Sequence, residues 1–186
     1  LANPGKTISQ IEMLSTDEKN RLLYEWNNTE AFFPQYKTIH GLFMEQAERI
    51  PDCVGLVGPV NLTYCKLNEL SDHVAWLLSE KGVLPDSIVG IMIERSIEMV
   101  TGIFGILKAG AAYLPIDRDY PQERIQYMLE DSNAKILLGI EGCRKEIIVN
   151  GQLLIVNLEL KSLPKAPSQN SSVIVHQSSH LAYIIY

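Results

Sequence analysis

Apolar residues recur at helical spacing in the middle of the chain and then give way to a short apolar run. Segment 97–107 carries them on two faces, and a helix that is apolar on most sides is buried. Lys108 and Gly110 predict the end of this helix, because a cation favours a helix C-terminus and glycine readily adopts the left-handed cap. Residues 111–116 are small or apolar and predict a buried strand. The stretch predicts half of a strand-helix-strand crossover.

Similar patterns on both sides extend this alternation. The predicted strands are 54–57, 62–63, 88–93, 136–139 and 153–156, and the predicted helices are 39–50, 64–81, 96–109 and one that begins near Pro121 and is broken at 131–133. Such alternation produces a mostly parallel sheet with helices on both faces, so the predicted fold class is α/β. We expect one sheet from the strands that begin near Val54, Ile88, Ala112, Ile136 and Leu153.

Capping residues mark where several helices begin. Ser15 and Glu18 form an S-x-x-E capping box, and Thr38 and Ser96 precede two of the longer apolar patterns. We expect the helix after Thr38 to bury a single face. That face carries Ile39, Leu42, Phe43, Ala47 and Ile50.

The ends of the chain differ from its middle. Residues 1–37 predict a linker with one surface helix, whose narrow apolar stripe holds Leu22, Leu23 and Trp26. Residues 38–186 predict the α/β domain. Because the chain has no initiator Met and finishes on the β-type run LAYIIY, we expect it to be a fragment of a longer protein.

Two stretches near the C-terminus leave alternatives open. Asn150 and Gly151 are the strongest hairpin signal in the chain, and a hairpin there would compete with the entry of segment 153–156 into the parallel sheet. We favour the parallel strand, because LLIV is apolar at every position, as a strand covered on both faces should be. Residues 164–179 are rich in proline, serine and asparagine and predict a mobile connector to a last strand at 181–186.

Composition narrows the function classes. The chain has 186 residues, 46% of them hydrophobic and 20% charged, and a net charge of -6, so we expect a soluble globular domain without the basic patch that nucleic acid or an anionic membrane would need. No apolar run approaches the roughly 20 residues of a membrane helix. A signal-peptide pattern is absent from the start of the printed sequence. We therefore expect a cytoplasmic location.

The candidate metal and redox residues carry weak signals. Cys53, Cys65 and Cys143 are far apart in the sequence, which predicts three reduced thiols rather than a disulfide or zinc framework. His176 and His180 have a spacing that could hold a metal on a helix, but their serine-rich surroundings predict a loop. We therefore predict no metal site.

Two groups of residues invite a catalytic interpretation that the sequence does not support. Asp117, Arg118, Asp119 and Glu123 could be paired acids and a clamp, yet a turn followed by an acidic first helical turn explains them. The glycines of TGIFG, Gly102 and Gly105, lie inside a predicted helix and indicate close packing rather than phosphate binding. We predict no catalytic, cofactor-binding or metal-binding residue in this chain.

Three stretches form a recognisable set: LTYCKLNELSDHVAWLLSEKGV (62–83), GIFGILKAGAAYLPIDRDYPQERIQYMLEDSNAKILL (102–138) and LAYIIY (181–186). They resemble the first core motif, the second core motif and the start of the third in the adenylation domains of nonribosomal peptide synthetases, members of the adenylate-forming superfamily. The segment ending TIHGLFMEQAERIPD is similar to the linker between a condensation domain and the adenylation domain after it. The resemblance covers almost the whole chain.

The resemblance also has departures. Cys65 and Lys66 stand where the family more often has a charged pair, and residues 70–72 stand where it commonly has a short alanine and asparagine run. Arg118 replaces the usual proline after the motif aspartate. We place all three outside the parts that touch substrate.

The resemblance implies a function for the parent protein. Such a ligase activates an amino acid as its adenylate with ATP and magnesium and loads it on the phosphopantetheine thiol of a carrier domain. In this family the phosphate loop directly follows the LAYIIY-like strand, so we expect the gene to continue past Tyr186 into a loop of the kind TSGSTG. The expected partners are the rest of the adenylation domain, an upstream condensation domain and a downstream carrier domain. The chain alone is predicted to be a non-catalytic structural subdomain.

Three other classes of protein are alternatives to this interpretation. An acyl-CoA or aryl acid ligase would share the fold but should lack the condensation-type linker at 1–37. A dinucleotide-binding domain needs a G-x-G-x-x-G turn after its first strand, which the sequence lacks. A module that only docks partners would use the helix that carries Trp26.

Overall fold

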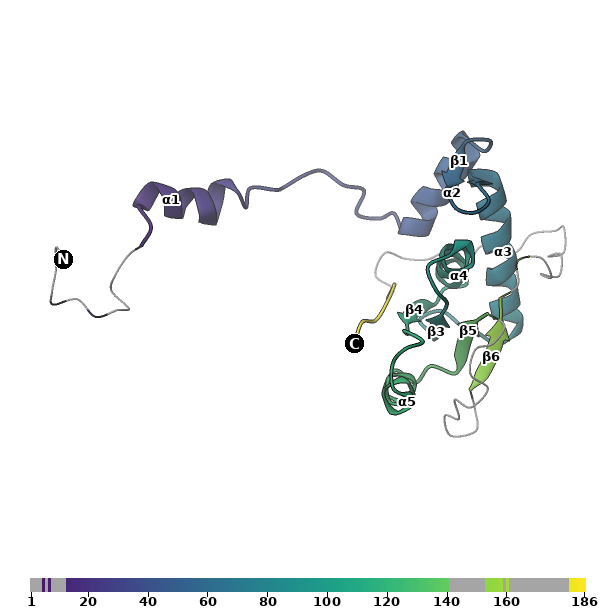
Figure 1. The fold of residues 1–186 in the computed structure, drawn as a ribbon. Coiled ribbons are helices and arrows are strands. Elements are labelled where there is room, and N and C mark those ends of the chain that lie inside the picture. Colours follow the sequence, from purple (N-terminus) through teal and green to yellow (C-terminus); the bar gives the residue numbers. More distant parts are fainter. Residues whose placement is uncertain (1–4, 6, 8–12, 141–152, 159, 161–180) are drawn as a thin grey trace. The chain divides into compact units, whose positions relative to one another are not determined.

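The computed structural model describes residues 5, 7, 13–140, 153–158, 160 and 181–186. The chain divides into two compact units, Leu1–Gln35 and Tyr36–Tyr186. Figure 1 traces the elements of both units along the sequence.

The first unit contains one short helix with a well-formed start. α1 (Thr16–Asn20) continues directly into a π-helical turn, η2 (Arg21–Glu25). The backbone N–H of Glu18 donates to Ser15 Oγ at 3.2 Å, and the Ser15 N–H donates to Glu18 Oε2 at 2.9 Å, which confirms the predicted capping box. Neither α1 nor η2 has a buried residue, and Leu22, Leu23 and Trp26 are all exposed.

The second unit is built on a four-stranded sheet. β3 (Ile88–Met92) lies between β4 (Ala112–Pro115) and β5 (Ile136–Gly139), and β6 (Leu154–Asn157) follows β5, in the order β4-β3-β5-β6. All three pairings are parallel. The predicted α/β class and the parallel entry of the last of these strands are confirmed, whereas the hairpin signal at 150–151 lies outside the described residues.

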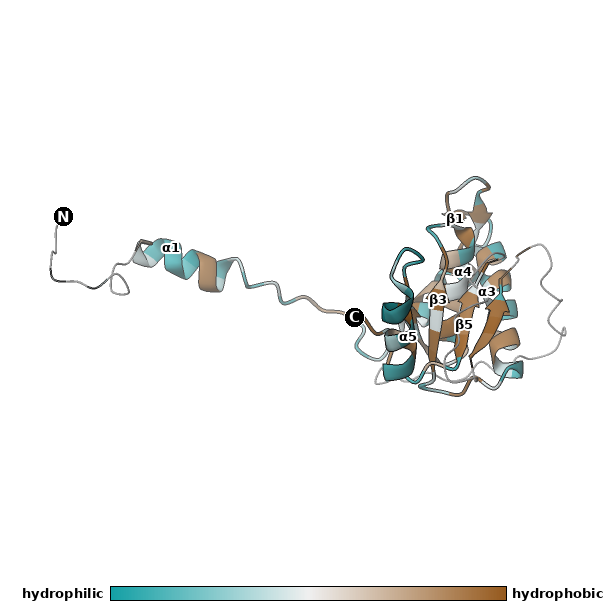
Figure 2. Ribbon diagram, turned by 60° about the horizontal axis from the view of Figure 1, so that its bottom comes forward, coloured by the Kyte–Doolittle hydropathy of each residue, from teal (hydrophilic) through white to brown (hydrophobic). Residues whose placement is uncertain are grey.

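Helices cover both faces of this sheet (Figure 2). α3 (Tyr64–Glu80) and α4 (Ile97–Lys108) pack on one face, and α5 (Gln122–Asp131) packs on the other. Alternation along β3 produces the two cores, since Ile91 belongs to the cluster under α3 and α4 while Met92 belongs to the cluster under α5.

The prediction that the first strand joins this sheet was wrong. β1 (Val54–Leu56) pairs antiparallel with β2 (Leu62–Thr63) in a separate two-stranded sheet. The short turn between the two strands reverses the chain direction, so the backbone groups of β1 pair with β2, the next strand in the sequence. Val54 is exposed, as a strand outside the main core allows.

The face that α2 (Ile39–Arg49) buries also differs from the prediction. His40, Phe43 and Ala47 are buried, while Ile39 and Leu42 are exposed. The reason is a stacking contact between Phe43 and Phe104 of α4, whose ring centroids are 4.2 Å apart. This contact turns Phe43 toward the core, together with the residues three positions before it and four positions after it on the same helix face.

Two segments near the C-terminus differ from prediction, one in its coverage and the other in its strand length. In β6 only Val156 is buried and Leu154 is 42% exposed, so LLIV is not covered on both faces. Segment 181–186 forms one parallel bridge, between Tyr183 and Tyr113 of β4, rather than a full strand. Both lie at an edge of the described sheet, with one strand neighbour each, and an edge position is less enclosed than the centre of the sheet.

The turn between α4 and β4 has the predicted geometry. Gly110 has φ of 92°, which is the left-handed conformation expected after the last helical turn. The Gly110 N–H donates to the Leu107 carbonyl at 3.1 Å, and the Ala111 N–H donates to the Ile106 carbonyl at the same distance. These two bonds satisfy carbonyls at the end of α4 and direct the chain into β4.

Candidate functional site

A cleft of about 740 Å³ lies at the carboxyl ends of β3 and β4. Its rim is made by the residues that follow each strand, Glu94 and Arg95 after β3 and 117–120 after β4. Loops at the carboxyl ends of parallel strands are where ligands of open α/β sheets bind. The cleft is therefore the strongest candidate for a ligand site in the described part of the chain.

The floor of the cleft is apolar and its rim is charged. Met99 and Ile103 of α4 and Met128 of α5 line it. At the rim, Arg118 Nη1 donates to Glu94 Oε1 at 2.8 Å and so joins the loops after β3 and β4. Both side chains are more than one third exposed, so this ion pair contributes at most about 1 kcal/mol.

The acidic residues after β4 occupy a turn and a helix start. Asp117 Oδ1 accepts a hydrogen bond from the Asp119 backbone N–H at 2.9 Å, and Glu123 lies in the first turn of α5. Arg118 pairs with Glu94 rather than with an acid of its own loop. This agrees with the predicted turn and acidic first turn; the paired-acid interpretation gains no support from these contacts.

Segment 181–186 forms another wall of the cleft through Ile185 and Tyr186. The Tyr186 hydroxyl donates to Asp131 Oδ2 at the end of α5, and this bond raises the pKa of Tyr186 to about 12. The Tyr127 ring meets the Tyr186 ring edge-on at 6.1 Å. Burial and the neighbouring Tyr183 also raise the pKa of Tyr113, whose backbone pairs with the segment.

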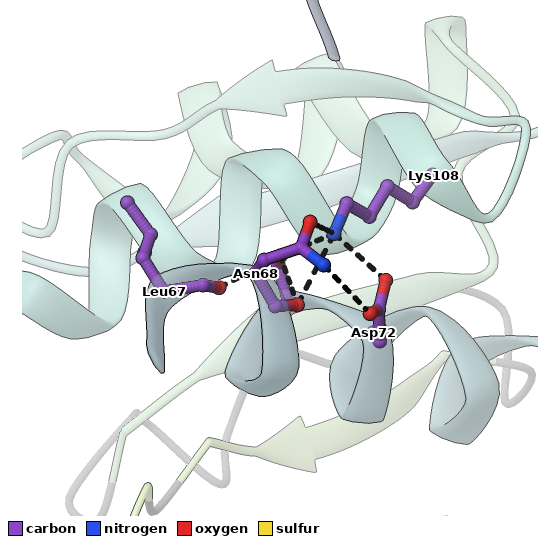
Figure 3. A network of polar contacts seen from close by, with 5 residues as sticks. Leu67, Asn68, Asp72 and Lys108 are labelled. Atoms are coloured by element: carbon purple, nitrogen blue, oxygen red, sulfur yellow. Dashed lines mark hydrogen bonds and ion pairs between the residues drawn. The ribbon is translucent and has the colours of Figure 1, made fainter. Parts of the chain in front are cut away.

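A buried lysine joins α3 to α4 (Figure 3). Lys108 Nζ donates to the Asn68 carbonyl at 3.1 Å, to Asn68 Oδ1 at 2.7 Å, to Ser71 Oγ at 2.8 Å and to Asp72 Oδ1 at 2.7 Å. Its side chain is 4% exposed, whereas that of Asp72 is 40% exposed. Burial lowers the pKa of Lys108, and the hydrogen bond and charge of Asp72 partly oppose that shift.

Sequence reasoning missed this cluster, which we name the Lys108 cluster (Asn68, Ser71, Asp72 and Lys108). The pattern around Lys108 predicts only a helix terminus, and Asp72 stands out only as part of a departure from the family pattern. A signal was available, because Asn68, Ser71 and Asp72 are three and four residues apart beside the buried residues of α3. Three polar side chains beside a buried stripe indicate a hydrogen-bond partner on another element of the structure, because buried polar groups are normally paired.

Two glycines of α4 provide close packing, as predicted. A Cβ on Gly105 would lie 2.5 Å from Val74 Cβ of α3, and one on Gly102 would lie 2.9 Å from Leu138 Cδ2 of β5. The two positions therefore bring α4 close to α3 and to the sheet.

The remaining candidates do not assemble into a site. Cys53 and Cys65 are exposed free thiols, while Cys143, His176 and His180 lie outside the described residues. Within the described ranges, no three His, Cys, Asp or Glu side chains come together as metal ligands would. None of the helices in that part of the chain combines the length and apolar character needed to cross a membrane.

A parallel α/β sheet with a cleft at the carboxyl ends of its strands defines a class of ligand-binding domains. The chain belongs to the family of AMP-binding enzymes, whose sequence model matches residues 43–186. This confirms the superfamily that the three motifs indicated.

Relatives and solved structures identify the branch of that family. The chain is 47% identical to bacitracin synthase 3 of Bacillus licheniformis and 46% identical to gramicidin S synthase 2 of Aneurinibacillus migulanus, in each case over 100% of its length. It spans only 3% and 4% of those two proteins. Among solved structures it is similar to the nonribosomal peptide synthetase FmoA3 in its AMPPNP-bound form, with a TM-score of 0.74 and 28% identity over 99% of this chain and 20% of that one. The form with α-methyl-L-serine-AMP gives a TM-score of 0.73 and 31% identity over 87% and 18%.

Proposed function

We propose that the protein containing this chain is a nonribosomal peptide synthetase, and that the chain is the first part of one of its adenylation domains. The carrying observation is 46% to 47% identity to two peptide antibiotic synthetases along the entire chain. The structural similarity to FmoA3, which has been seen with α-methyl-L-serine-AMP bound, points to an amino acid as the activated substrate.

The proposed reaction has two steps. The amino-acid carboxylate attacks the α-phosphorus of ATP and pyrophosphate leaves, with magnesium balancing the phosphate charge. The phosphopantetheine thiol of a carrier domain then displaces AMP and forms a thioester. We place the protein in the cytoplasm, where ATP is available and where Cys53 and Cys65 would remain free thiols.

We assign residues 1–37 to the linker from an upstream condensation domain and residues 38–186 to the amino-terminal subdomain. The family model begins at residue 43, whereas the two synthetases match the chain from end to end. The extra match supports a segment that belongs to multidomain synthetases rather than to AMP-binding enzymes in general.

The 186-residue chain by itself is proposed to be inactive. In the family that the chain resembles, the loops that bind phosphate, adenine and carboxylate come after the position of Tyr186. An enzyme that works by positioning its substrates is inactive without the groups that position them. The test is amino-acid-dependent exchange of pyrophosphate into ATP, run with the whole protein and with the 186-residue chain over all twenty amino acids and a set of aryl acids. We expect exchange by the whole protein with one or a few amino acids and none by the chain. Exchange only with aryl acids, or exchange by the isolated chain, would contradict the proposal.

A further inference from the structure

Segment 181–186 is attached to the second unit at three places. The Leu181 N–H donates to Asp86 Oδ1 at 3.3 Å at the start of the segment. In the middle, Tyr113 of β4 accepts from the Ile184 N–H at 3.1 Å and donates to the Ala182 carbonyl at 3.0 Å. At the far end, the Tyr186 hydroxyl bonds to Asp131.

The last of these attachments lies where backbone pairing has ended. Ile184 is the final residue of the segment with a backbone hydrogen bond to β4, and its side chain packs against the core beneath α5. Ile185 and Tyr186 extend beyond it and line the cleft. Their position therefore depends on the side chain of Tyr186, which is held by Asp131 on one side and by the edge-on Tyr127 ring on another.

The carboxylate of Asp131 lies at the end of a helix where negative charge is unfavourable. It is the last residue of α5, and the last turn of that helix contains Glu130 and Asp131 but no basic residue. Negative charge at a helix C-terminus opposes the helix dipole and is unfavourable there. The neighbouring Glu130 bonds within the helix to Gln126, whereas Asp131 reaches across to the segment. Helix stability thus does not account for Asp131, whose described partner is the Tyr186 hydroxyl.

We propose that Asp131 is a positioning residue for adenylation, which acts through the Tyr186 hydroxyl by fixing the end of segment 181–186 at the cleft. The inference rests on the proposed function, in which the residues after Tyr186 bind the phosphates of ATP. A chain leaving the sheet at a fixed point and direction presents such residues to the phosphates without first having to be ordered. Loss of the bond would weaken the hold on ATP and leave the amino-acid pocket unaffected.

The test uses pyrophosphate exchange by the whole protein, with KM measured separately for ATP and for the amino acid. Tyr186→Phe removes only the hydroxyl and Asp131→Ala removes the carboxylate, so each should raise KM for ATP about tenfold, the effect of one charge-assisted hydrogen bond. The amino-acid KM should stay within about twofold. Asp131→Asn keeps an acceptor oxygen but loses the charge, so it should raise KM for ATP only about threefold. Glu130→Ala is the matched control, because it removes the adjacent carboxylate, which bonds to Gln126, and it should behave as the unmodified protein.

A titration of the 186-residue chain separates failure of this inference from failure of the proposed function. The difference in alkaline tyrosinate absorbance between the chain and its Tyr186→Phe variant isolates Tyr186, which should titrate near 12, and near the ordinary value of about 10 in Asp131→Ala. Circular dichroism confirms that each variant is folded. If the bond is present and the whole protein exchanges pyrophosphate, but both variants keep KM for ATP, the inference is wrong and the function stands. If the whole protein activates no acid, the function and the inference fall together, whatever the titration gives.

Discussion

The Lys108 cluster should respond very differently to removal of its two charges. Asp72→Ala leaves a lysine that is 4% exposed without its counter-ion, whereas Lys108→Met leaves a carboxylate that is 40% exposed and can be hydrated. Methionine also fills most of the volume of the lysine stem. We therefore expect Asp72→Ala to be the more destabilising substitution, although both remove the same ion pair.

The magnitudes follow from the contacts and from the titration of the lysine. An unpaired buried charge costs about 3 to 5 kcal/mol, but Lys108 would keep bonds to Asn68 and Ser71, so about 2 to 3 kcal/mol is expected for Asp72→Ala at pH 7. The cost has an upper limit, because the lysine can lose its proton instead. The ordinary lysine pKa of 10.5 lies about 3.5 units above pH 7. At 1.36 kcal/mol per unit, loss of the proton at pH 7 costs about 4.8 kcal/mol, which is the upper limit. Lys108→Met should cost about 1 kcal/mol or less.

The pH dependence has a definite sign. Burial favours neutral Lys108 and lowers its pKa, so the penalty for the unpaired charge is full below the folded-state pKa and disappears as the pH rises through it toward 10.5. Because pH 9.5 is only one unit below the ordinary lysine pKa, the upper limit on the penalty falls to about 1.4 kcal/mol there. The deficit of Asp72→Ala must therefore shrink on going from pH 7 to pH 9.5.

Urea denaturation of the two single variants and the double variant at both pH values gives the free energies of unfolding and the coupling between the residues. The double variant should be close to Lys108→Met alone. Glu69→Ala, on the exposed side of the same helix, removes an ion pair with Lys66 and should change stability by about 0.5 kcal/mol or less. Equal losses in the two single variants, or a deficit in Asp72→Ala that is the same at both pH values, would refute this account of the cluster.

Two further predictions concern glycines that the backbone requires. Gly110→Val should reduce the free energy of unfolding by at least about 1 to 2 kcal/mol, because a β-branched residue can hardly adopt φ of 92°. Thermal melting measures the loss, and Gly110→Asn is the control, for which a smaller loss is expected. Equal melting temperatures for the Val variant and the unmodified chain would contradict the prediction. Gly105→Ala should reduce the free energy of unfolding, measured with urea, by about 1 to 3 kcal/mol, because the new Cβ would clash with Val74. Most of that loss should disappear when the substitution is made in a Val74→Ala background. An unchanged loss in that background would show that the clash is not with Val74.

The sequence predicted those features that short segments determine by themselves. Ser15, Thr38 and Ser96 each accept a backbone hydrogen bond at a helix start, and Gly110 has the predicted positive φ. The helix and strand order was also predictable, since periodicity is a property of neighbouring residues. The membership of β1 in a sheet was not, because its pattern is equally compatible with pairing to β2.

Features that depend on distant residues escaped prediction for a physical reason. The face of α2 is selected by the stacking of Phe43 on Phe104, 61 positions along the chain, and the helical pattern of α2 alone holds no information on that ring. The cleft wall likewise depends on a bond between Tyr186 and Asp131. Contacts of this kind become evident only when the sheet has brought α5 and the segment together.

The Lys108 cluster connects a family departure to the stability of the fold. Ser71 and Asp72 lie in the short stretch 70–72, where the chain departs from the family pattern that its motifs otherwise resemble. In this chain both side chains bond to Lys108, and Asp72 supplies the negative charge that the buried cation needs. An amide in its place could accept a hydrogen bond but could not balance the charge. The departure is therefore an electrostatic feature of the contact between α3 and α4, and α4 is also the helix that contributes Met99 and Ile103 to the cleft.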